Sequence, residues 1–309
     1  MNYFPCGVKP QKIKIDGISV NLDKIEYASY GEEIVEAYQL PYELIRGGAV
    51  VLNGEIHILG GTSTGNGQKH YKLNTGNWEQ VSTLPYAFND NPVVAYNNEI
   101  HAFFGTGHYK WDGATWTRVS TSPINMQYGS AVILNDEIHI LGDINHYKWD
   151  GSTWTQVSTL PYTFGKGAAT VLNGEIHILG GTTNGTTSGG TNKHYKWDGS
   201  TWTQVSSMPY SASRNTVVVL NNEIHLLGGV AASSNFYVYD LHKIWNGTEW
   251  RAADNLPYGF AWGAAVVLND EIHIMGGEST TNTGSASTSE HGLKHYILNL
   301  KKYRLIIHN

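Results

Sequence analysis

Six side chains that could contact a ligand occur at one position of a repeating pattern. Each stands five residues after a proline that closes a repeat, and they are Arg46, Asp90, Tyr128, Lys166, Arg214 and Trp262. Three cations, a carboxylate and two aromatic rings could together bind a polar ligand by ion pairing and stacking. Because this position changes while its neighbours repeat, we predict that these six residues form a ligand-binding face.

Twelve histidines behave in the opposite way, because they recur at two fixed positions of every repeat. The first position holds His57, His101, His139, His177, His225 and His273, and the second holds His70, His108, His146, His194, His242 and His295. Two histidines at the same places in each of several separate repeats do not bring their rings together around one metal ion. We therefore expect the histidines to be structural and predict no metal site.

No other group of residues suggests catalysis or a cofactor. The chain has no glycine-rich phosphate loop, and no serine and histidine stand apart from the repeats beside an acid. The only cysteine is Cys6, so an internal disulfide is excluded. We accordingly expect a protein that is not an enzyme and uses no cofactor.

Charge and hydropathy exclude two classes of partner. The formal net charge is -6, with 20 lysines and arginines in 309 residues and no basic run, which argues against nucleic-acid binding. No apolar stretch approaches the roughly 20 residues that span a bilayer. Residues 1–6 lack the features of a signal peptide, so we expect the product to be made in the cytoplasm without membrane insertion.

The predicted site residues must be positioned by β-hairpins. Residues 51–61, Val-Leu-Asn-Gly-Glu-Ile-His-Ile-Leu-Gly-Gly, recur unchanged at 171–181, and four looser copies have Asn-Asn or Asn-Asp at the centre. These dipeptides favour the positive φ angles of a type I′ turn. Each copy is therefore predicted to contain two antiparallel strands.

A second pair of strands is predicted in each repeat. In one copy Tyr109 and Trp116 lie seven residues apart on either side of Asp112-Gly113, a turn dipeptide. A closing Leu-Pro-Tyr follows in most copies, and its proline suits the exit from an outer strand. The sequence thus predicts four short strands per repeat.

The Gly-Gly pair followed by Tyr, six residues and Trp resembles the kelch repeat, six times over residues 41–309. The resemblance implies an all-β fold, a kelch-type β-propeller whose blades have four antiparallel strands. Residues 11–40 are interpreted as a degenerate first blade, and Leu305–Ile307 as the outer strand of the last copy, with Tyr303 in the Trp position. We favour seven blades; six blades plus an N-terminal attachment hairpin is the alternative. The expected domains are 1–40 and 41–309.

The face that carries the predicted site is expected to be uneven. The loops after the Gly pairs are long in four repeats, at residues 62–69, 182–193, 230–241 and 278–294, and almost absent near Gly107 and Ile144-Asn145. Long loops on a rigid scaffold are common places for binding. We therefore expect a face with a high wall and a low side.

The expected function is a non-enzymatic binding module. The near-verbatim repeats look like kelch proteins from the tail and baseplate regions of phages that infect Gram-positive bacteria. This resemblance implies a virion protein that binds a bacterial surface glycan or protein and attaches to a tail or baseplate partner through residues 1–40. Two alternatives stay open: a kelch-type enzyme acting on sugars, similar to sialic-acid mutarotases, and an intracellular protein-interaction scaffold.

Overall fold

The computed structural model describes residues 12–15, 18–21, 25–27, 32–61, 65–183, 190–232, 237–280, 286–287, 291–300 and 305–307 of the 309-residue chain. All regular structure in these ranges is β, and none of them contains a helix long and apolar enough to cross a membrane. The chain forms two compact units, one of residues 34–299 and the other of residues 1–33 with 300–309. The larger unit carries the predicted site.

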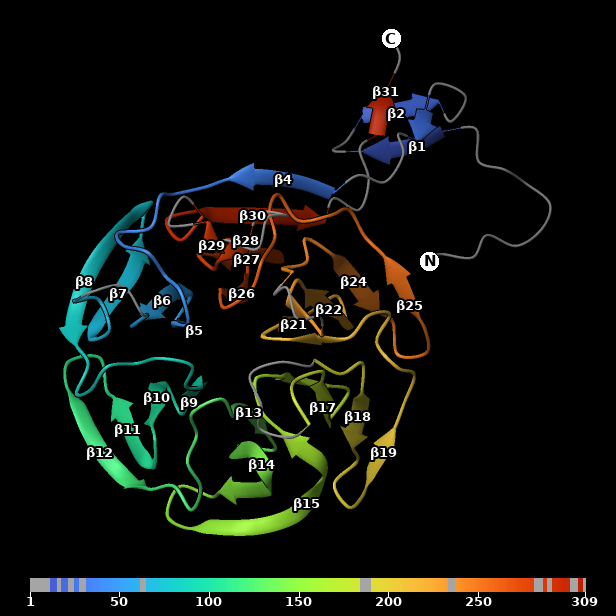
Figure 1. Cartoon of the computed structure of the whole chain (residues 1–309). Helices are drawn as coiled ribbons and strands as arrows, with labels where there is room; N and C mark the ends of the chain where they lie inside the picture. Colours follow the sequence, from blue (N-terminus) through green and yellow to red (C-terminus); the bar gives the residue numbers. More distant parts are fainter. Residues whose placement is uncertain are drawn as a thin grey trace. The chain divides into compact units, whose positions relative to one another are not determined.

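Residues 34–299 form a ring of six blades, which confirms the β-propeller fold (Figure 1). The first blade contains β5 (Gly48–Leu52), β6 (Glu55–Leu59), β7 (Lys69–Asn74) and β8 (Asn77–Thr83). The second contains β9 (Val93–Tyr96), β10 (Glu99–Phe104), β11 (Gly107–Trp111) and β12 (Trp116–Thr121). The third contains β13 (Ser130–Leu134), β14 (Glu137–Trp149) and β15 (Trp154–Phe164). The fourth blade contains β16 (Ala168–Leu172), β17 (Glu175–Leu179), β18 (His194–Trp197) and β19 (Trp202–Gln204). The fifth contains β21 (Thr216–Leu220), β22 (Glu223–Leu227), β24 (His242–Trp245) and β25 (Trp250–Ala252). The sixth contains β26 (Ala264–Leu268), β27 (Glu271–Met275), β30 (His295–Leu300) and β4 (Glu32–Glu36).

The sixth blade shows that the favoured count of seven is wrong and that the six-bladed alternative is right. Its outer strand is β4, from the N-terminal part of the chain, and the Ala37 amide donates to the His295 carbonyl at 2.7 Å. A strand from the N-terminal part of the chain thus completes the blade at the other end, and the described residues of 11–40 form no blade of their own.

The last strand of the chain also differs from the prediction. Residues Leu305–Ile307 (β31) pair with β3 (Ile25–Tyr27), not with β30. Near the N-terminus, β1 (Lys12–Ile15) pairs with β2 (Ile18–Asn21) in an antiparallel arrangement. Tyr303 lies outside the described residues.

The first hairpin of each blade has the predicted turn. Asn53 and Gly54 have φ angles of 52° and 77°, and Asn97 and Asn98 have φ angles of 49° and 62°. Positive φ at both central residues matches the right-handed twist of the two strands. The register Leu52↔Glu55 places the turn at these residues.

The hydrophobic core lies between neighbouring blades. In one cluster, Val132 and Leu160 of the third blade pack with Ile176, Ile178 and Trp197 of the fourth. The side chains alternate along each strand, so each blade buries one face against each neighbour.

A chain of hydrogen bonds, which we call the histidine relay, links the blades. His101 Nδ1 lies 2.9 Å from His108 Nε2, and His108 Nδ1 lies 3.0 Å from Ser120 Oγ. That hydroxyl also accepts from Trp154 Nε1 of the next blade at 2.9 Å. The pair of histidines recurs in all six blades at 2.8–2.9 Å, and the link through Ser to Trp recurs at Ser82 and Ser158. The histidines therefore stabilise the fold.

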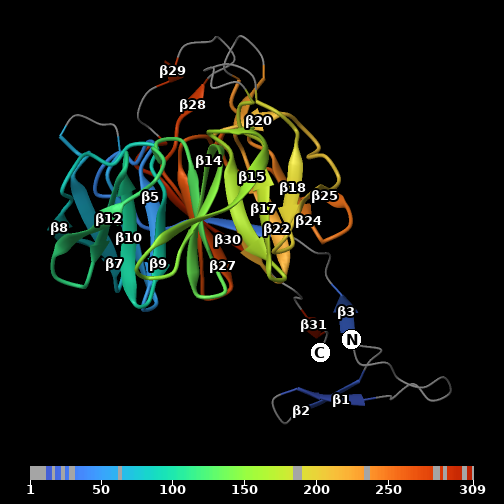
Figure 2. The same ribbon diagram turned by 90° about the horizontal axis from the view of Figure 1, so that it is seen from below.

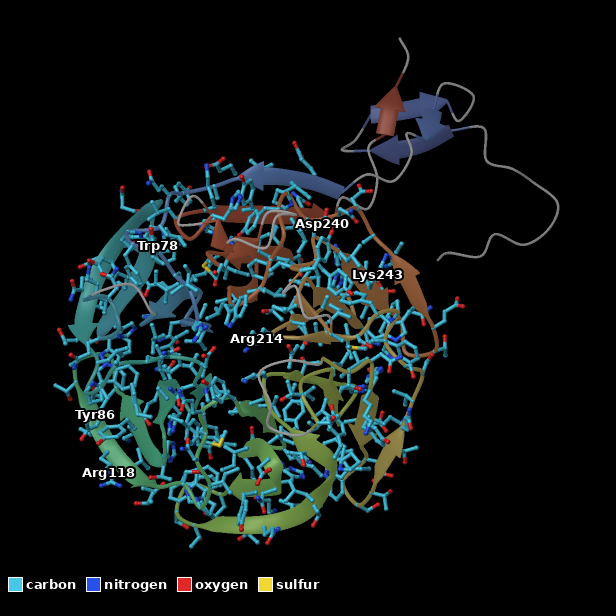
Figure 3. The ribbon with its side chains drawn as sticks, in the orientation of Figure 1. Trp78, Tyr86, Arg118, Arg214, Asp240 and Lys243 are labelled. Atoms are coloured by element: carbon cyan, nitrogen blue, oxygen red, sulfur yellow. The ribbon has the colours of Figure 1, made fainter. Side chains whose placement is uncertain are left out.

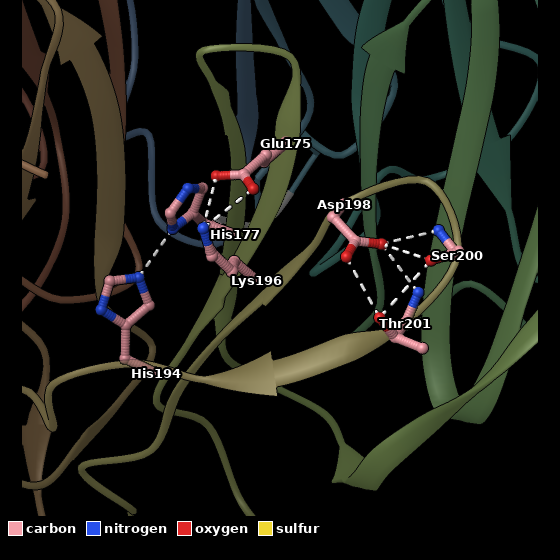
Figure 4. A network of polar contacts seen from close by, with 7 residues as sticks. All are labelled: Glu175, His177, His194, Lys196, Asp198, Ser200 and Thr201. Carbon is pink, nitrogen blue, oxygen red and sulfur yellow. Dashed lines mark hydrogen bonds and ion pairs between the residues drawn. The ribbon is translucent and has the colours of Figure 1, made fainter.

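Other repeated polar residues are also paired within their blade (Figure 4). Lys196 donates to Glu175 at 2.9 Å, across two neighbouring strands. Asp198 accepts the Ser200 and Thr201 amides, each at 2.8 Å, in the turn before the outer strand. The repeated polar side chains of the strands and turns thus form hydrogen bonds within their own blade.

Candidate functional site

The six predicted site residues all lie at the start of the innermost strands, at one end of the central channel. All six have left-handed backbone conformations, with φ angles of 61° for Arg46, 54° for Asp90, 69° for Tyr128, 58° for Lys166, 57° for Arg214 and 58° for Trp262. The structure therefore brings the whole predicted set together, one residue from each blade.

Their backbones form a closed ring of hydrogen bonds, which we call the hub ring. Each amide donates to the carbonyl of the corresponding residue in the preceding blade: Asp90 to Arg46 at 2.9 Å, Tyr128 to Asp90 at 2.7 Å, Lys166 to Tyr128 at 2.8 Å, Arg214 to Lys166 at 2.5 Å, Trp262 to Arg214 at 3.5 Å and Arg46 to Trp262 at 2.7 Å. The left-handed conformation turns each amide toward its neighbour and holds the side chains at the channel mouth.

This conformation is unfavourable for the residue types that occupy it. Glycine adopts positive φ at no steric cost, and Asp tolerates it, but Arg, Lys, Tyr and Trp do so at a cost of roughly 1–3 kcal/mol each. Such strained residues cluster at functional sites. The backbone conformation therefore does not account for the large side chains found at these positions.

The hub ring surrounds a cavity of about 130 Å³. Besides the six ring residues, its walls include Asn91, Asn215 and Thr216, together with Gly47, Gly129, Gly167 and Gly263. Figure 3 shows Arg214 near the centre of the ring. The cavity is large enough for a small anionic group with its immediate substituents.

Charge in the cavity is mostly positive. Arg46 Nη1 lies 3.6 Å from Asp90 Oδ2, and the side chain of Asp90 is only 14% exposed. Burial raises the pKa of Asp90, while Arg46, Arg214 and Lys166 act against that rise. Burial and the charge of Arg214 lower the pKa of Lys166. Three cations around one carboxylate favour an anionic ligand.

The two aromatic ring residues hold the cations in place. The guanidinium carbons of Arg46 and Arg214 lie 5.5 Å and 4.8 Å from the Trp262 ring centroid, and Lys166 Nζ lies 4.6 Å from that of Tyr128. Cation–π contacts of this kind contribute about 0.5–2 kcal/mol. Trp262 and Tyr128 thus orient the charged side chains. The sequence had led us to expect that the two rings stack on the ligand.

Sequence reasoning missed two asparagines in the cavity wall. The residue after each hub-ring position is glycine in four blades and asparagine at Asn91 and Asn215. Asn91 donates to the Asn89 carbonyl at 2.8 Å, whereas the amide atoms of Asn215, which is 6% exposed, make no hydrogen bond to a described residue. Comparison of the repeats at this adjacent position would have found both.

The face is uneven in its described parts; residues 62–64, 184–189, 233–236, 281–285 and 288–290 of the predicted long loops lie outside the described residues. β20 (Ala212–Ser213) pairs with β23 (Val230–Ala231), and β28 (Ser279–Thr280) with β29 (Ala286–Ser287), and these pairs stand above one end of the blades (Figure 2). In contrast, Phe104 pairs directly with Gly107 in the second blade, and β14 passes through a tight turn at Asp143 in the third. The low side therefore lies over the second and third blades.

The histidine, aspartate and glutamate side chains are spread over the blades in the parts of the chain that the structure describes. Within them, no group of three or more His, Cys, Asp or Glu side chains is placed to hold a metal ion. The buried histidines are held as hydrogen-bonded pairs, and burial lowers the pKa of His101 to about 4 and that of His108 to about 3.

Comparison with known proteins supports the fold. No family model matches the chain, and no curated protein matches it by sequence. The solved structure of YjhT is similar, with a TM-score of 0.71 and 14% sequence identity over 88% of this chain and 99% of that chain. At this identity the likeness shows the β-propeller fold alone.

Proposed function

We propose that this propeller is a non-enzymatic binding module whose hub-ring cavity takes an anionic group of a surface glycan. The observation that carries the proposal is the hub ring itself. Six residues hold a strained conformation that glycine would adopt more easily, and five of them are of types that disfavour it. Retention of large side chains there is accounted for by a ligand that contacts them.

The chemistry of the ligand follows from the charges. Arg46, Lys166 and Arg214 converge with Asp90 around one cavity. Guanidinium and ammonium groups bind carboxylate and phosphate by charge-assisted hydrogen bonds. Carboxylated and phosphorylated sugars of bacterial surfaces share this oxyanion chemistry.

The test measures binding by variants in which Arg46, Lys166 and Arg214 are changed to Ala, singly and together. The probes are an array of uronic-acid, sialic-acid and phosphodiester-linked glycans. We expect loss of binding to one acidic class, with Lys148→Ala, which removes a repeated lysine outside the cavity, behaving as wild type. Unchanged binding by the folded triple variant, or no binding to any acidic glycan, would overturn the proposal.

The place of the protein in a phage tail or baseplate is part of the same proposal. It is supported by the resemblance of the near-verbatim repeats and by a sequence with few charged residues, 15% of the total. Labelling of purified particles with an antibody against this chain should mark the tail. Absence of the chain from purified particles would remove this assignment and leave the binding function to be judged by the glycan array.

A catalytic alternative is favoured by one observation, the environment of Asp90. Its Oδ2 atom is buried and makes no hydrogen bond to a described residue, and its pKa is raised. A carboxyl group in this state can act as a general acid or base on a bound sugar. Interconversion of sugar anomers followed by NMR, with Asp90→Asn as the comparison, would reveal this activity.

A further inference from the structure

The second blade departs from the repeat at one residue, and the departure changes the surface. Five blades have glycine at the equivalent position. Gly60, Gly180, Gly228 and Gly276 follow the second strand with φ angles of 62°, 68°, 57° and 63°, whereas Gly142 of the third blade lies within β14 and does not have a positive φ. The second blade has Phe104 at this position, and β10 continues through it. Phe104, a residue type that disfavours positive φ, does not have it, and like Gly142 it lies within its strand.

The position of Phe104 determines what happens to the tyrosine that closes the preceding repeat. In three blades the glycine carbonyl accepts from the tyrosine hydroxyl: Tyr162 to Gly180 at 2.9 Å, Tyr210 to Gly228 at 2.9 Å and Tyr258 to Gly276 at 2.6 Å. In the first blade the equivalent Tyr42 is 5% exposed, and its hydroxyl makes no hydrogen bond to a described residue. Tyr162 and Tyr258 are only 6% and 7% exposed. The equivalent Tyr86 is 57% exposed, because the chain does not turn at Phe104 and the short turn that follows does not cover it.

The exposed tyrosine is part of a cluster of three rings, which we call the aromatic platform. The centroid of Tyr86 lies 6.0 Å from that of Phe104 and 5.8 Å from that of Tyr109, and Phe104 and Tyr109 are 5.5 Å apart. Phe88 packs edge-on against Phe104 from the other side at 5.7 Å. The platform is therefore anchored in the core through Phe88, which is fully buried.

From this geometry we infer that the aromatic platform is a second binding subsite, which takes the face of a pyranose ring in an acidic oligosaccharide. The inference rests on the proposed function of the hub-ring cavity. Tyrosine presents an apolar ring face beside a polar hydroxyl, and a pyranose presents an apolar C–H face with hydroxyls at its edge. The adjoining turn, Gly105-Thr106-Gly107, carries no charge, which suits a neutral face of the sugar.

The location of the platform sets the length of the ligand. Tyr86 lies toward the rim of the propeller and Arg214 near its centre (Figure 3). The platform belongs to the low side of the face, where the short turn of the second blade leaves the approach open. A ligand that reaches both subsites must therefore be an oligosaccharide, whereas a single acidic sugar would occupy the cavity alone.

The test is calorimetric titration with galacturonic acid and with its oligomers of increasing length. For the wild type we expect affinity to rise with length, by about 2- to 10-fold once the platform is reached. Tyr86→Ala should bind the monomer normally and lose the dependence on length. Tyr237→Ala, which removes another exposed tyrosine, should retain it.

A second variant tests the cause. Phe104→Gly restores the residue of the other blades, so Tyr86 should become buried and the dependence on length should disappear. Chemical acetylation of Tyr86 would report the burial independently of any ligand.

The outcomes separate the two proposals. Monomer binding with no dependence on length, or a dependence that Tyr86→Ala retains, overturns the platform and leaves the cavity intact. Failure of both the monomer and the oligomers to bind overturns the platform and removes the support for uronic acids in the cavity.

Discussion

The hub ring and the histidine relay each take residues from one fixed set of positions in every blade. The two sets differ in how strictly the residue types repeat and in how the side chains are paired. The histidine pairs of the relay are the same in all six blades and are hydrogen-bonded, as in the 2.9 Å contact between His101 and His108. Hub-ring residues are of five different types in six copies and take left-handed conformations. They include Asp90, whose buried oxygen makes no hydrogen bond to a described residue. Within one chain, repetition thus marks structure, and departure from it marks surfaces free to contact a ligand.

The largest effect that we predict is the loss of folding stability at acidic pH, through protonation of the relay histidines. The pKa of His57 is lowered to about 4 and that of His70 to about 3, mainly by burial. The unfolded chain takes up these protons near pH 6.5, so the stability is present above that pH and is lost as the pH falls toward 4. Each histidine whose pKa is lowered in this way contributes roughly 1 kcal/mol per pH unit in this window, and a typical domain has about 5–15 kcal/mol in total.

We therefore expect the propeller to unfold by about pH 5. Circular dichroism and urea midpoints between pH 8 and 4.5 would check this. A stability that stays constant over this range would show that the buried histidine pairs do not govern folding.

Removal of a shared hydroxyl in the relay should have the next largest effect. Ser120→Ala leaves His108 Nδ1 and Trp154 Nε1 without their partner. An unsatisfied buried group costs about 1–3 kcal/mol, so the urea midpoint should fall accordingly. Ser152→Ala, in an exposed turn, serves as the control. Equal midpoints for both variants would remove the proposed link between blades.

A smaller effect is expected in the hub ring from neutralising its acid. Asp90→Asn keeps a side chain that tolerates positive φ and removes the negative charge among the three cations. Affinity for an acidic sugar should rise roughly tenfold, which corresponds to about 1.4 kcal/mol. Asp270→Asn places in one hairpin turn the residue found in two others and should change nothing. A weaker affinity of Asp90→Asn would mean that the carboxylate itself contacts the ligand.

The smallest effect is expected from the repeated ion pairs on the sheet surface. Lys148 and Glu137 lie 3.0 Å apart, with side chains 36% and 23% exposed. Exposed pairs of this kind contribute about 0–1 kcal/mol. Lys148→Met should therefore lower the urea midpoint only slightly and leave binding unaffected. A loss above 2 kcal/mol would show that the pair has a structural role that its exposure does not indicate.

The sequence allowed the blades and the composition of the hub ring to be predicted, because both depend on local, repeated signals. Asn53-Gly54 requires a tight turn wherever it occurs, and Arg46 and Lys166 share a position relative to a proline. The blade count depended on which strand pairs with β30, a long-range choice between Glu32–Glu36 and Leu305–Ile307 that periodicity does not determine. The left-handed conformation of the hub-ring residues and the exposure of Tyr86 could not be predicted from the sequence either, because both arise from packing between blades.

The most direct test of the account replaces Arg46, Lys166 and Arg214 together by glycine. Stability of the triple variant is followed by urea unfolding, and binding is followed on the acidic glycan array. We predict that stability stays the same or increases, because glycine relieves the strained conformation, while binding to acidic glycans is lost. A large loss of stability would show that these side chains serve the fold, and retained binding would show that they do not contact the ligand.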